Sequence, residues 1–329
     1  MYDVDAARAA LCPLDWADPA PPDGVLAGYV RFYGLDFGGR IAGLRHGIGT
    51  FEVDTVAGHC FRIAAQTFQL PAPRGTVLIL HGYYDHVGIF DHVIEHLLAR
   101  GLDVVAFDLP GHGLSSGARA EIDSFSEYQQ VLDAALGGLA SSRLAVPLSV
   151  VAQSTGGGII MEWLLRARST RESSPFASVV VLSPLVRPAH WGANRFLFQA
   201  MRLFRDSVPR KFVANSHDSE FLHFLREVDP LQPRRLPVSW VGAMKRWFPQ
   251  LEHATPCEYP LAVIQGDEDG TVDWRHNLGV IRRLFPEASI CMIPTGRHQL
   301  ANEAPALREP VFTELDRVIP LAEFQAADA

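Results

Sequence analysis

From about residue 75 onward, short apolar segments alternate with stretches in which apolar residues recur every three or four positions. Short runs of apolar, β-branched residues are typical of strands covered on both faces, whereas the longer period is that of an amphipathic helix. The predicted strands are 76–80, 103–107, 148–152, 178–182, 261–265 and 288–293. Strands that alternate with helices predict the α/β class, with a mostly parallel, twisted sheet and helices on both faces.

Two of the intervening stretches carry clear helix signals. The apolar residues of 89–98 share one helical face, and Gly101 follows where a C-terminal cap is expected. Ser124 and Glu127 have the spacing of a capping box ahead of a second helix. These signals place the first two helices between the first three strands of the parallel sheet.

The first part of the chain has a different pattern. Segments 51–56 and 59–68 predict two paired strands separated by a turn. Residues 1–45 contain Pro-rich and Gly-rich stretches and little periodicity. We therefore expect them to form an extended N-terminal wrap that the core does not require.

The alternation stops between about Arg187 and His253, a stretch dense in large apolar residues. Open α/β sheets bind ligands beyond the carboxyl ends of their strands, so this stretch is interpreted as a helical cap lying there. Trp191 and Phe196 are candidates for its pocket wall, although each could equally belong to the cap's own core. The expected organisation is an N-terminal extension (1–45), an α/β core (46–186 and 256–329) and an inserted cap (187–255).

The sharpest chemical signal is the segment AQSTGGG at 152–158, between a predicted strand and a predicted helix. A serine hydroxyl is a weak nucleophile unless it is held exposed and beside a base, and a strand–turn–helix elbow provides that position. The usual pattern is G-x-S-x-G, and here the first glycine is replaced by Ala152, which is small enough to fit. Ser154 is therefore the predicted nucleophile.

An elbow serine predicts its partners in the order serine, acid, histidine. The fifth predicted strand leads into four carboxylates. Asp273 is most simply the N-cap of the next helix, and Asp269 is preferred to Asp267 because it lies far enough past the strand to point across the sheet ends. The loop after the last strand offers His298, which would take the Ser154 proton and return it to the leaving group.

The loop after the first parallel strand, HGYY at 81–84, is the expected source of an oxyanion hole. We assign that hole to the main-chain N–H groups of Tyr83 and Thr155, and each such donor is typically worth about 2.7–4 kcal/mol at the transition state. Tyr84 and Gln153 lie beside these donors in the sequence and are candidate substrate-binding residues.

Five stretches together resemble the monoacylglycerol lipase and lysophospholipase branch of the α/β-hydrolases, which is also filed with the serine aminopeptidases. They are HGYYDHVGIF (81–90), DLPGHGLSSG (108–117), AQSTGGG (152–158), QGDEDGTVD (265–273) and GRHQLANE (296–303). The resemblance implies a catalytic triad at Ser154, Asp269 and His298 and a helical cap that gates an acyl pocket. The elbow differs from these lipases, which usually carry histidine and methionine at the positions of Gln153 and Thr155.

Charge narrows the set of partners. The net charge of −8 argues against nucleic acid as a general partner. Residues 187–253 instead hold 11 lysines and arginines against 6 aspartates and glutamates. A basic, aromatic cap could touch an anionic membrane surface, but arginine stems packed over the cap aromatics are the preferred explanation.

The chain has no apolar run of the roughly 18–20 residues that span a bilayer, and its acidic start does not resemble a signal peptide. A cytoplasmic location is therefore expected.

The cysteines and histidines give no sign of a metal site. The four cysteines are far apart in the sequence and form no CxxC pair, so they are expected to be buried apolar thiols. His81, Asp85, His86, His92 and His96 are close in sequence, but no second cluster supplies further ligands. No metal and no cofactor are expected.

Taken together, these features predict a serine hydrolase that cleaves carboxylic esters through an acyl-enzyme. Its partner would be a small-molecule or lipid ester, such as a monoacyl lipid, a lysophospholipid or a medium-chain ester. Two alternatives stay open. An amidase, peptidase or thioesterase could use the same triad, and a non-catalytic ligand-binding protein could use the same scaffold.

Overall fold

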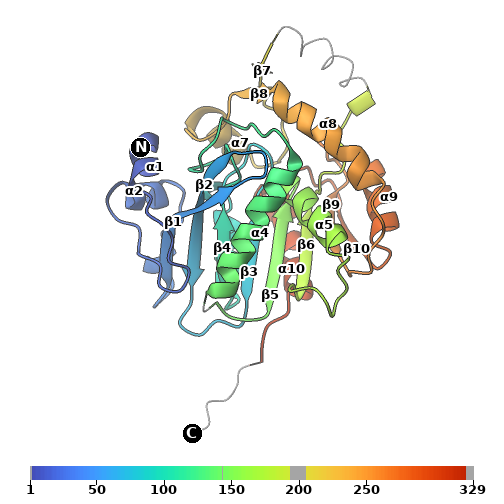
Figure 1. Ribbon diagram of the computed structural model, residues 1–329. Coiled ribbons are helices and arrows are strands. Elements are labelled where there is room, and N and C mark those ends of the chain that lie inside the picture. Colours follow the sequence, from blue (N-terminus) through green and yellow to red (C-terminus); the bar gives the residue numbers. More distant parts are fainter. Residues whose placement is uncertain (1, 143, 193–204, 324–329) are drawn as a thin grey trace.

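The computed structural model describes residues 2–142, 144–192 and 205–323 of the 329-residue chain. Its centre is an eight-stranded sheet in the order β1-β2-β4-β3-β5-β6-β9-β10 (Figure 1). The strands are β1 Arg45–Asp54, β2 Cys60–Gln69, β3 Thr76–Leu80, β4 Asp103–Phe107, β5 Leu148–Gln153, β6 Ser178–Leu182, β9 Ala262–Gly266 and β10 Ser289–Ile293. Only the β1–β2 and β2–β4 pairs of this sheet are antiparallel, so the predicted mostly parallel sheet is confirmed.

Helices cover both faces of the sheet. The helices that follow or join the strands are α3 Asp91–Ala99, α4 Phe125–Ser141, α5 Thr155–Arg166, α9 Trp274–Leu284 and α10 Pro305–Val318. Ser124 and Glu127 form the predicted capping box at the start of α4. The described 3₁₀ turns are η1 Phe37–Gly39, η2 Val87–Ile89 and η4 Leu300–Asn302.

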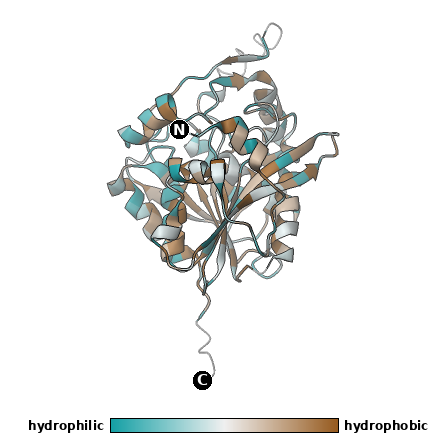
Figure 2. Cartoon of the chain, turned by 90° about the vertical axis from the view of Figure 1, so that its left-hand side faces the viewer, coloured by the Kyte–Doolittle hydropathy of each residue, from teal (hydrophilic) through white to brown (hydrophobic). Residues whose placement is uncertain are grey.

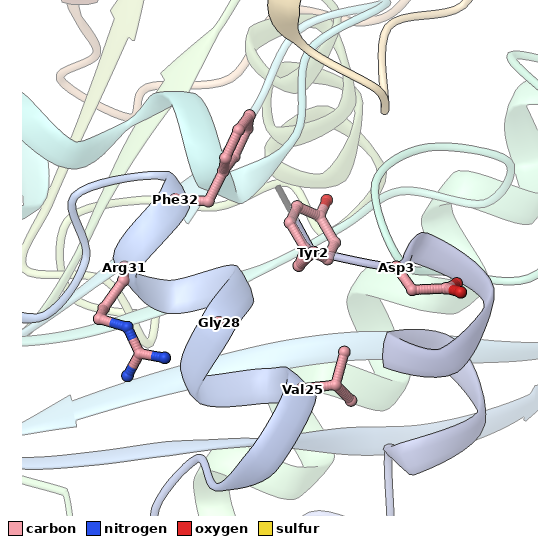
Figure 3. A pocket seen from close by; sticks show the side chains of 6 residues that line it. All are labelled: Tyr2, Asp3, Val25, Gly28, Arg31 and Phe32. Atoms are coloured by element: carbon pink, nitrogen blue, oxygen red, sulfur yellow. The ribbon is translucent and has the colours of Figure 1, made fainter.

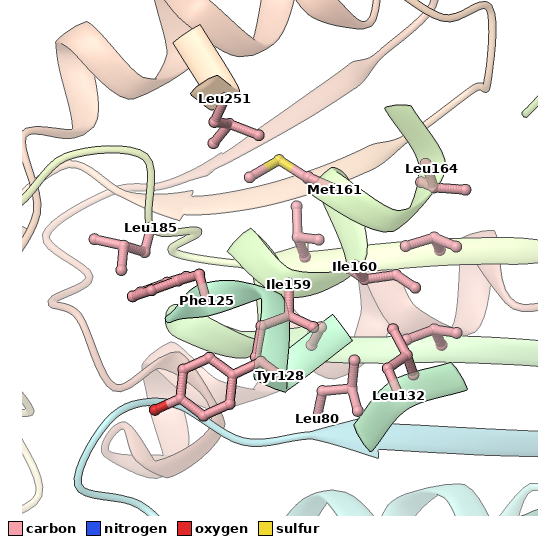
Figure 4. Packing of buried hydrophobic residues seen from close by; sticks show 14 of the residues in the cluster. Leu80, Phe125, Tyr128, Leu132, Ile159, Ile160, Met161, Leu164, Leu185 and Leu251 are labelled. Atoms are coloured by element: carbon pink, nitrogen blue, oxygen red, sulfur yellow. The ribbon is translucent and has the colours of Figure 1, made fainter. Parts of the chain in front are cut away.

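Each face of the sheet packs into its own apolar cluster. Successive strand residues point to opposite sides, and β3 shows this directly, because Leu78 and Leu80 lie in one cluster while Val77 and Ile79 lie in the other. The first cluster takes in α4 and α5, which Figure 4 shows, and also α9. The second takes in α3 and α10. Apolar strands therefore run through the interior, and Figure 2 shows the polar residues on the outer helices.

The N-terminal segment, residues 1–45, differs from the extended wrap that we expected. It forms two helices, α1 Val4–Ala10 and α2 Gly24–Phe32. Leu26, Tyr29 and Tyr33 have helical spacing and are buried in the second cluster. The prolines and glycines around these residues obscured the helical spacing in the sequence. The segment is part of the apolar core on the face of the sheet that packs into the second cluster.

Between β6 and β9 the described chain forms an antiparallel ribbon and further helical segments. They are β7 Ser207–Pro209, α7 Ser219–His223, the π-helical turn η3 Phe224–Val228, β8 Arg235–Pro237 and α8 Val238–Glu252. The apolar face of α8 packs on the first cluster, where the Trp247 ring stacks on Phe125 with their centroids 4.4 Å apart. Figure 1 shows α8 lying across one end of the sheet.

The described chain shows neither cross-linking nor a membrane span. All four cysteines are free, and the expectation that they would be buried is wrong for Cys12 and Cys60, which are exposed. Cys291 is half-buried, and Cys257 is buried as expected. None of the described helices combines the length and apolar character that crossing a bilayer requires.

Candidate active site

Ser154 occupies the tight turn between β5 and α5. Its backbone lies at φ 52° and ψ −109°, which an L-residue adopts only at a cost of about 1–3 kcal/mol. The glycines that follow let the helix come close to the sheet. A Cβ added to Gly156 would lie 2.4 Å from the Leu80 carbonyl oxygen, and one added to Gly158 would lie 2.8 Å from the Trp247 ring. The glycines therefore allow α5 to pack tightly against the sheet directly after the serine.

Three loops at the carboxyl ends of parallel strands bring Ser154, Asp269 and His298 together. The Nε2 atom of His298, after β10, lies 3.0 Å from Oγ of Ser154. Its Nδ1 atom lies 2.8 Å from Oδ2 of Asp269, which follows β9. With the imidazole proton on Nδ1, His298 donates to the carboxylate and accepts from the serine hydroxyl. The serine is thus hydrogen-bonded to a base whose orientation is held from behind.

The competing carboxylates after β9 have other partners. Oδ1 of Asp267 accepts from the main-chain N–H of Thr295 at 2.6 Å. Asp273 caps α9 and accepts from the Arg187 guanidinium at 2.6 Å. Asp269 is therefore the acid that the fold brings to the imidazole.

Asp269 is surrounded by donors. Its Oδ1 accepts from the N–H groups of Thr271 (2.8 Å) and Val272 (3.1 Å), and its Oδ2 accepts from Nε2 of Gln265 at 3.1 Å. Burial acts to raise the pKa of Asp269, but the His298 charge and hydrogen bond and the main-chain donors hold that pKa below its ordinary value. Burial likewise acts to lower the pKa of His298, and the Asp269 carboxylate outweighs it, so that pKa is raised.

The residues of the two proposed oxyanion donors line the same cavity as Ser154. Thr155 is the first residue of α5, so no carbonyl one turn earlier within the helix accepts from its N–H. The loop that carries Tyr83 passes equally close, because a Cβ added to Gly82 would lie 3.1 Å from the Ser154 Cβ. Tyr84, the next residue, has a φ of 71°, which turns the chain sharply there. Tyr83, Thr155 and Ser154 line one cavity.

His81 anchors the loop that carries Tyr83 through two hydrogen bonds. With its proton on Nδ1, it donates to the Gly82 carbonyl at 2.7 Å, and its Nε2 accepts from the Leu109 N–H at 2.8 Å. Burial lowers the pKa of His81 well below its ordinary value, so the ring stays neutral. The Tyr83 ring stacks on Trp240 of α8 with the centroids 3.6 Å apart, and the loop is therefore fixed from both sides.

Gln153 lies elsewhere than on the pocket wall that we expected for it. It is fully buried, is not among the cavity-lining residues, and donates from Nε2 to the His298 carbonyl at 2.8 Å. Strand alternation could have revealed this position, since Gln153 shares the face of Val151, which belongs to the second cluster. Gln153 thus supports the histidine loop.

Ser154 and His298 line a cavity of about 640 Å³ whose lining is mainly apolar. Trp191 and Tyr84 line it, as the sequence predicts. Trp240 and Met244 of α8 also line it, and the sequence pattern did not distinguish them as pocket residues. Phe196 lies outside the described residues. The space suits an aliphatic chain, because apolar surface removed from water gains about 25 cal/mol per Å².

A second hollow, of about 570 Å³, lies on the N-terminal segment and is lined by Tyr2, Asp3, Val25, Gly28, Arg31 and Phe32 (Figure 3). None of the three triad residues lines it. The chemistry therefore belongs to the cavity at Ser154.

Polar residues on the cavity wall were not foreseen from the sequence. Asp85, Gln299 and Arg210 line it, and Nε2 of Gln299 donates to Oδ1 of Asp85 at 2.9 Å. Asp85 belongs to the same loop as Tyr83, which could have marked it, whereas nothing in the sequence distinguished Arg210 from its neighbours. In the described part of the chain, no group of three or more His, Cys, Asp or Glu side chains is arranged to hold a metal ion.

Comparison with solved structures places the same fold in known enzymes. A soluble variant of monoglyceride lipase from Saccharomyces cerevisiae aligns with a TM-score of 0.65 and 18% identity, over 78% of this chain and 91% of that one. Monoacylglycerol lipase from Paleococcus ferrophilus aligns with a TM-score of 0.62 and 21% identity, over 78% of this chain and 97% of that one. At these identities the likeness concerns the fold.

Sequence comparison extends the similarity. The chain is 28% identical to a monoacylglycerol lipase of Mycolicibacterium smegmatis, over 70% of this chain and 83% of the relative. It is 26% identical to phospholipase YtpA of Bacillus subtilis, over 63% of this chain and 80% of the relative. The model of the family described as "Serine aminopeptidase, S33" matches residues 71–305, well over half of the chain. This chain therefore belongs to the serine aminopeptidase S33 family of α/β-hydrolases.

Proposed function

We propose that this protein hydrolyses carboxylic esters, with Ser154 as the nucleophile, His298 as the general base and Asp269 as the group that orients the imidazole and stabilises its protonated form. The observation that carries the proposal is the continuous hydrogen-bonded line from Ser154 Oγ through the imidazole to Asp269, with distances of 3.0 and 2.8 Å. Relatives named as monoacylglycerol lipase and phospholipase support an ester as the substrate.

The reaction follows from this geometry. His298 Nε2 takes the hydroxyl proton as Ser154 Oγ attacks the ester carbonyl, and the negative charge on the former carbonyl oxygen is met by the N–H groups of Tyr83 and Thr155. His298 then gives the proton to the departing alcohol, and the acyl group stays on Ser154. Water, activated by the same nitrogen, releases the acid and restores the serine.

The substrate class that we propose is a monoacyl lipid or medium-chain ester, with the acyl chain along the apolar wall. Residues 187–255 would act as the cap, since α8 from this stretch supplies Trp240 and Met244 to the cavity. Trp191 and Tyr84 would contact the substrate from the same cavity. Truncating the wall with Met244→Ala should lower kcat/KM more for decanoyl than for acetyl esters, because only the longer chain reaches it.

The first test is covalent labelling. A fluorophosphonate probe should label the wild-type protein, Ser154→Ala should abolish the label, and Ser183→Ala should keep it. Ser183 is a suitable control because it is also buried and has a positive φ but is absent from the cavity lining. A wild-type protein that stays unlabelled, or a label that survives Ser154→Ala, would contradict the assignment.

The family description also names aminopeptidases, so amide cleavage is the second candidate. Ser154, activated by the same two partners, would attack an amide in the same way. The shape and polarity of the cavity would then decide whether esters or amides are the better substrates. Comparing p-nitrophenyl esters of several chain lengths with aminoacyl p-nitroanilides separates the two. Faster turnover of the anilides, measured as kcat/KM, would replace the ester proposal.

Contact with an anionic membrane surface is the proposed route to lipid substrates. Lys211 and Val213 line the cavity, and Val213 is 68% exposed. Two arginines of this segment, Arg210 and Arg234, lie over the Phe212 ring instead. Lys211→Gln should weaken flotation with phosphatidylglycerol vesicles at low salt and leave phosphatidylcholine vesicles unaffected. Equal binding of wild type to both vesicles would contradict it.

A further inference from the structure

The cavity at Ser154 has lining residues of two unlike kinds. Apolar ones include Trp240 and Met244 of α8, which belong to the first cluster. Three others are cations, Arg210, Lys211 and Arg226. None of the three forms an ion pair with a carboxylate in the ranges that the structure describes. Three uncompensated cations stand out in a chain with a net charge of −8.

Arg210 is the most firmly held of the three. Its guanidinium carbon lies 4.0 Å from the centre of the Tyr84 ring and 4.3 Å from that of Phe212. Its Nη1 donates to Oε1 of Gln232 at 2.6 Å and to the Pro233 carbonyl at 3.3 Å. These contacts fix the plane of the group but occupy a single nitrogen. Nε and Nη2 have no acceptor among the described residues.

The carboxylate that acts on Arg210 forms no ion pair with it. Asp85 lines the same cavity and influences Arg210 from beyond ion-pair distance. Its Oδ1 is engaged by Nε2 of Gln299 at 2.9 Å. Burial raises the pKa of Asp85 above its ordinary value, although the Gln299 hydrogen bond and the nearby cations act to lower it. The guanidinium is therefore a pre-positioned cation that lacks an anion.

We propose that Arg210 binds a phosphate or carboxylate on the alcohol portion of the ester, and so selects anionic monoacyl esters over neutral ones. The proposal rests on ester hydrolysis at Ser154. Arg210 stacks on Tyr84, which directly follows the proposed oxyanion donor Tyr83, so an anion held by Arg210 would lie in the same cavity as Ser154. Two parallel N–H groups of a guanidinium match two oxygens of such an anion.

The test compares two water-soluble esters of the same acyl chain below their micellar concentrations. They are hexanoyl lysophosphatidate, which carries a phosphate, and monohexanoylglycerol, which is neutral. We expect wild type to prefer the phosphate ester in kcat/KM. Arg210→Gln should lower the ratio of the two kcat/KM values about tenfold to a hundredfold, the range for hydrogen bonds to a charged group. An unchanged ratio, or a wild type that prefers the neutral ester, overturns the proposal.

Two controls separate charge at this position from charge in general. Arg205→Gln removes the same charge from an exposed residue of the same segment that is absent from the cavity lining, and it should leave the ratio unchanged. Arg210→Lys keeps the charge without the planar fork and should recover part of the preference. An equal loss of preference in Arg205→Gln would assign the effect to overall charge and contradict a role for Arg210.

The remaining outcomes are also decisive. A protein that is labelled by the fluorophosphonate but shows no preference for the phosphate ester keeps the ester proposal and loses this one. A protein that is neither labelled nor active loses both. Glycerol phosphate should inhibit hydrolysis of the neutral ester competitively in wild type and more weakly in Arg210→Gln. If the preference arises only on anionic vesicles and never with monomeric substrate, the anion recognised is a lipid surface, and the pocket assignment is wrong.

Discussion

The described part of the chain holds two buried histidine–aspartate pairs, and only one of them faces Ser154. His298 and Asp269 are 2.8 Å apart, and His86 and Asp229 are 2.9 Å apart. Burial acts to lower the pKa of each histidine, and the partner carboxylate outweighs it, so both of these pKa values are raised. The electrostatics of the two pairs are therefore alike.

The pairs differ in what the second ring nitrogen contacts. The free nitrogen of His298 meets the Ser154 hydroxyl on a cavity wall. That of His86 accepts from the N–H of Gly88 at 3.1 Å, and the pair lies wholly inside the protein. A buried histidine–carboxylate pair thus indicates a base only when its remaining nitrogen reaches a group that can react.

Asp229 shows what the second pair does instead. It accepts from the Tyr33 hydroxyl at 2.6 Å, the Leu231 N–H at 2.9 Å and Nε2 of Gln232 at 2.9 Å. Burial acts to raise the pKa of Asp229, and His86 with these donors lowers it to about 2. The pair joins α2, the loop after β3 and the end of η3, so its role is to hold these segments together.

The comparison is tested most strongly by making one substitution in both pairs. Asp269→Asn should lower kcat/KM for a p-nitrophenyl ester about ten-thousandfold, because the amide favours the wrong imidazole tautomer. Asp229→Asn should lower it far less in protein that remains folded. Circular dichroism before each assay shows that folded protein is compared. Similar losses of activity in the two folded variants would remove the distinction.

The second pair should matter more for stability. Asp229→Ala leaves His86 without its partner and should lower the free energy of unfolding by about 3–5 kcal/mol, measured by urea denaturation. Asp316→Ala is the control at a partly exposed site, since Asp316 lies 2.7 Å from His96 and 3.0 Å from Arg100. A pair of that kind contributes about 0–1 kcal/mol. Equal losses of unfolding free energy in the two variants would show that the buried His86–Asp229 pair contributes no more to stability than a partly exposed one.

The N-terminal segment contacts the His86–Asp229 pair through the Tyr33 hydroxyl, which donates to Asp229. Tyr33→Phe removes a hydrogen bond to a charged group and should cost about 1.5–3 kcal/mol of unfolding free energy. Tyr259→Phe is the comparison, because its hydroxyl donates to the neutral Phe176 carbonyl at 3.0 Å and should cost about 1 kcal/mol. A smaller effect for Tyr33→Phe than for Tyr259→Phe would mean that the segment contributes little to the pair.

The smallest expected effect is a shift of the pH profile. His298 acts as a base only when neutral, so activity falls as acid protonates it. Because Asp269 and Asp85 raise the pKa of His298 against burial, the acid limb of kcat/KM should have its midpoint above about pH 6.5. Asp85→Asn should move that midpoint to lower pH by less than one unit. A wild-type midpoint well below 6.5 would show that burial outweighs the carboxylates.

Much of the fold could be predicted, because its signals are local. Apolar runs, helical periods and the Ser124–Glu127 capping box each depend on a few adjacent residues, and the parallel strands and the capping box appear where expected. The first strand is an exception, since it was predicted at 51–56 and runs over Arg45–Asp54. The elbow at Ser154 is local in the same way. The order serine, acid, histidine then limited the search for partners to two loops, and this is why Asp269 and His298 could be named.

The sequence by itself determined the alternation of strands and helices, the elbow and the order of the three reacting groups. Only the tertiary structure decided that Gln153 supports His298, that Asp229 pairs with His86 across 143 residues, and that Arg210 lies on Tyr84. Backbone periodicity is set by neighbours in the chain, so it can be followed along the sequence. Contacts between distant side chains depend on how the strands and helices stack, and no local pattern encodes that.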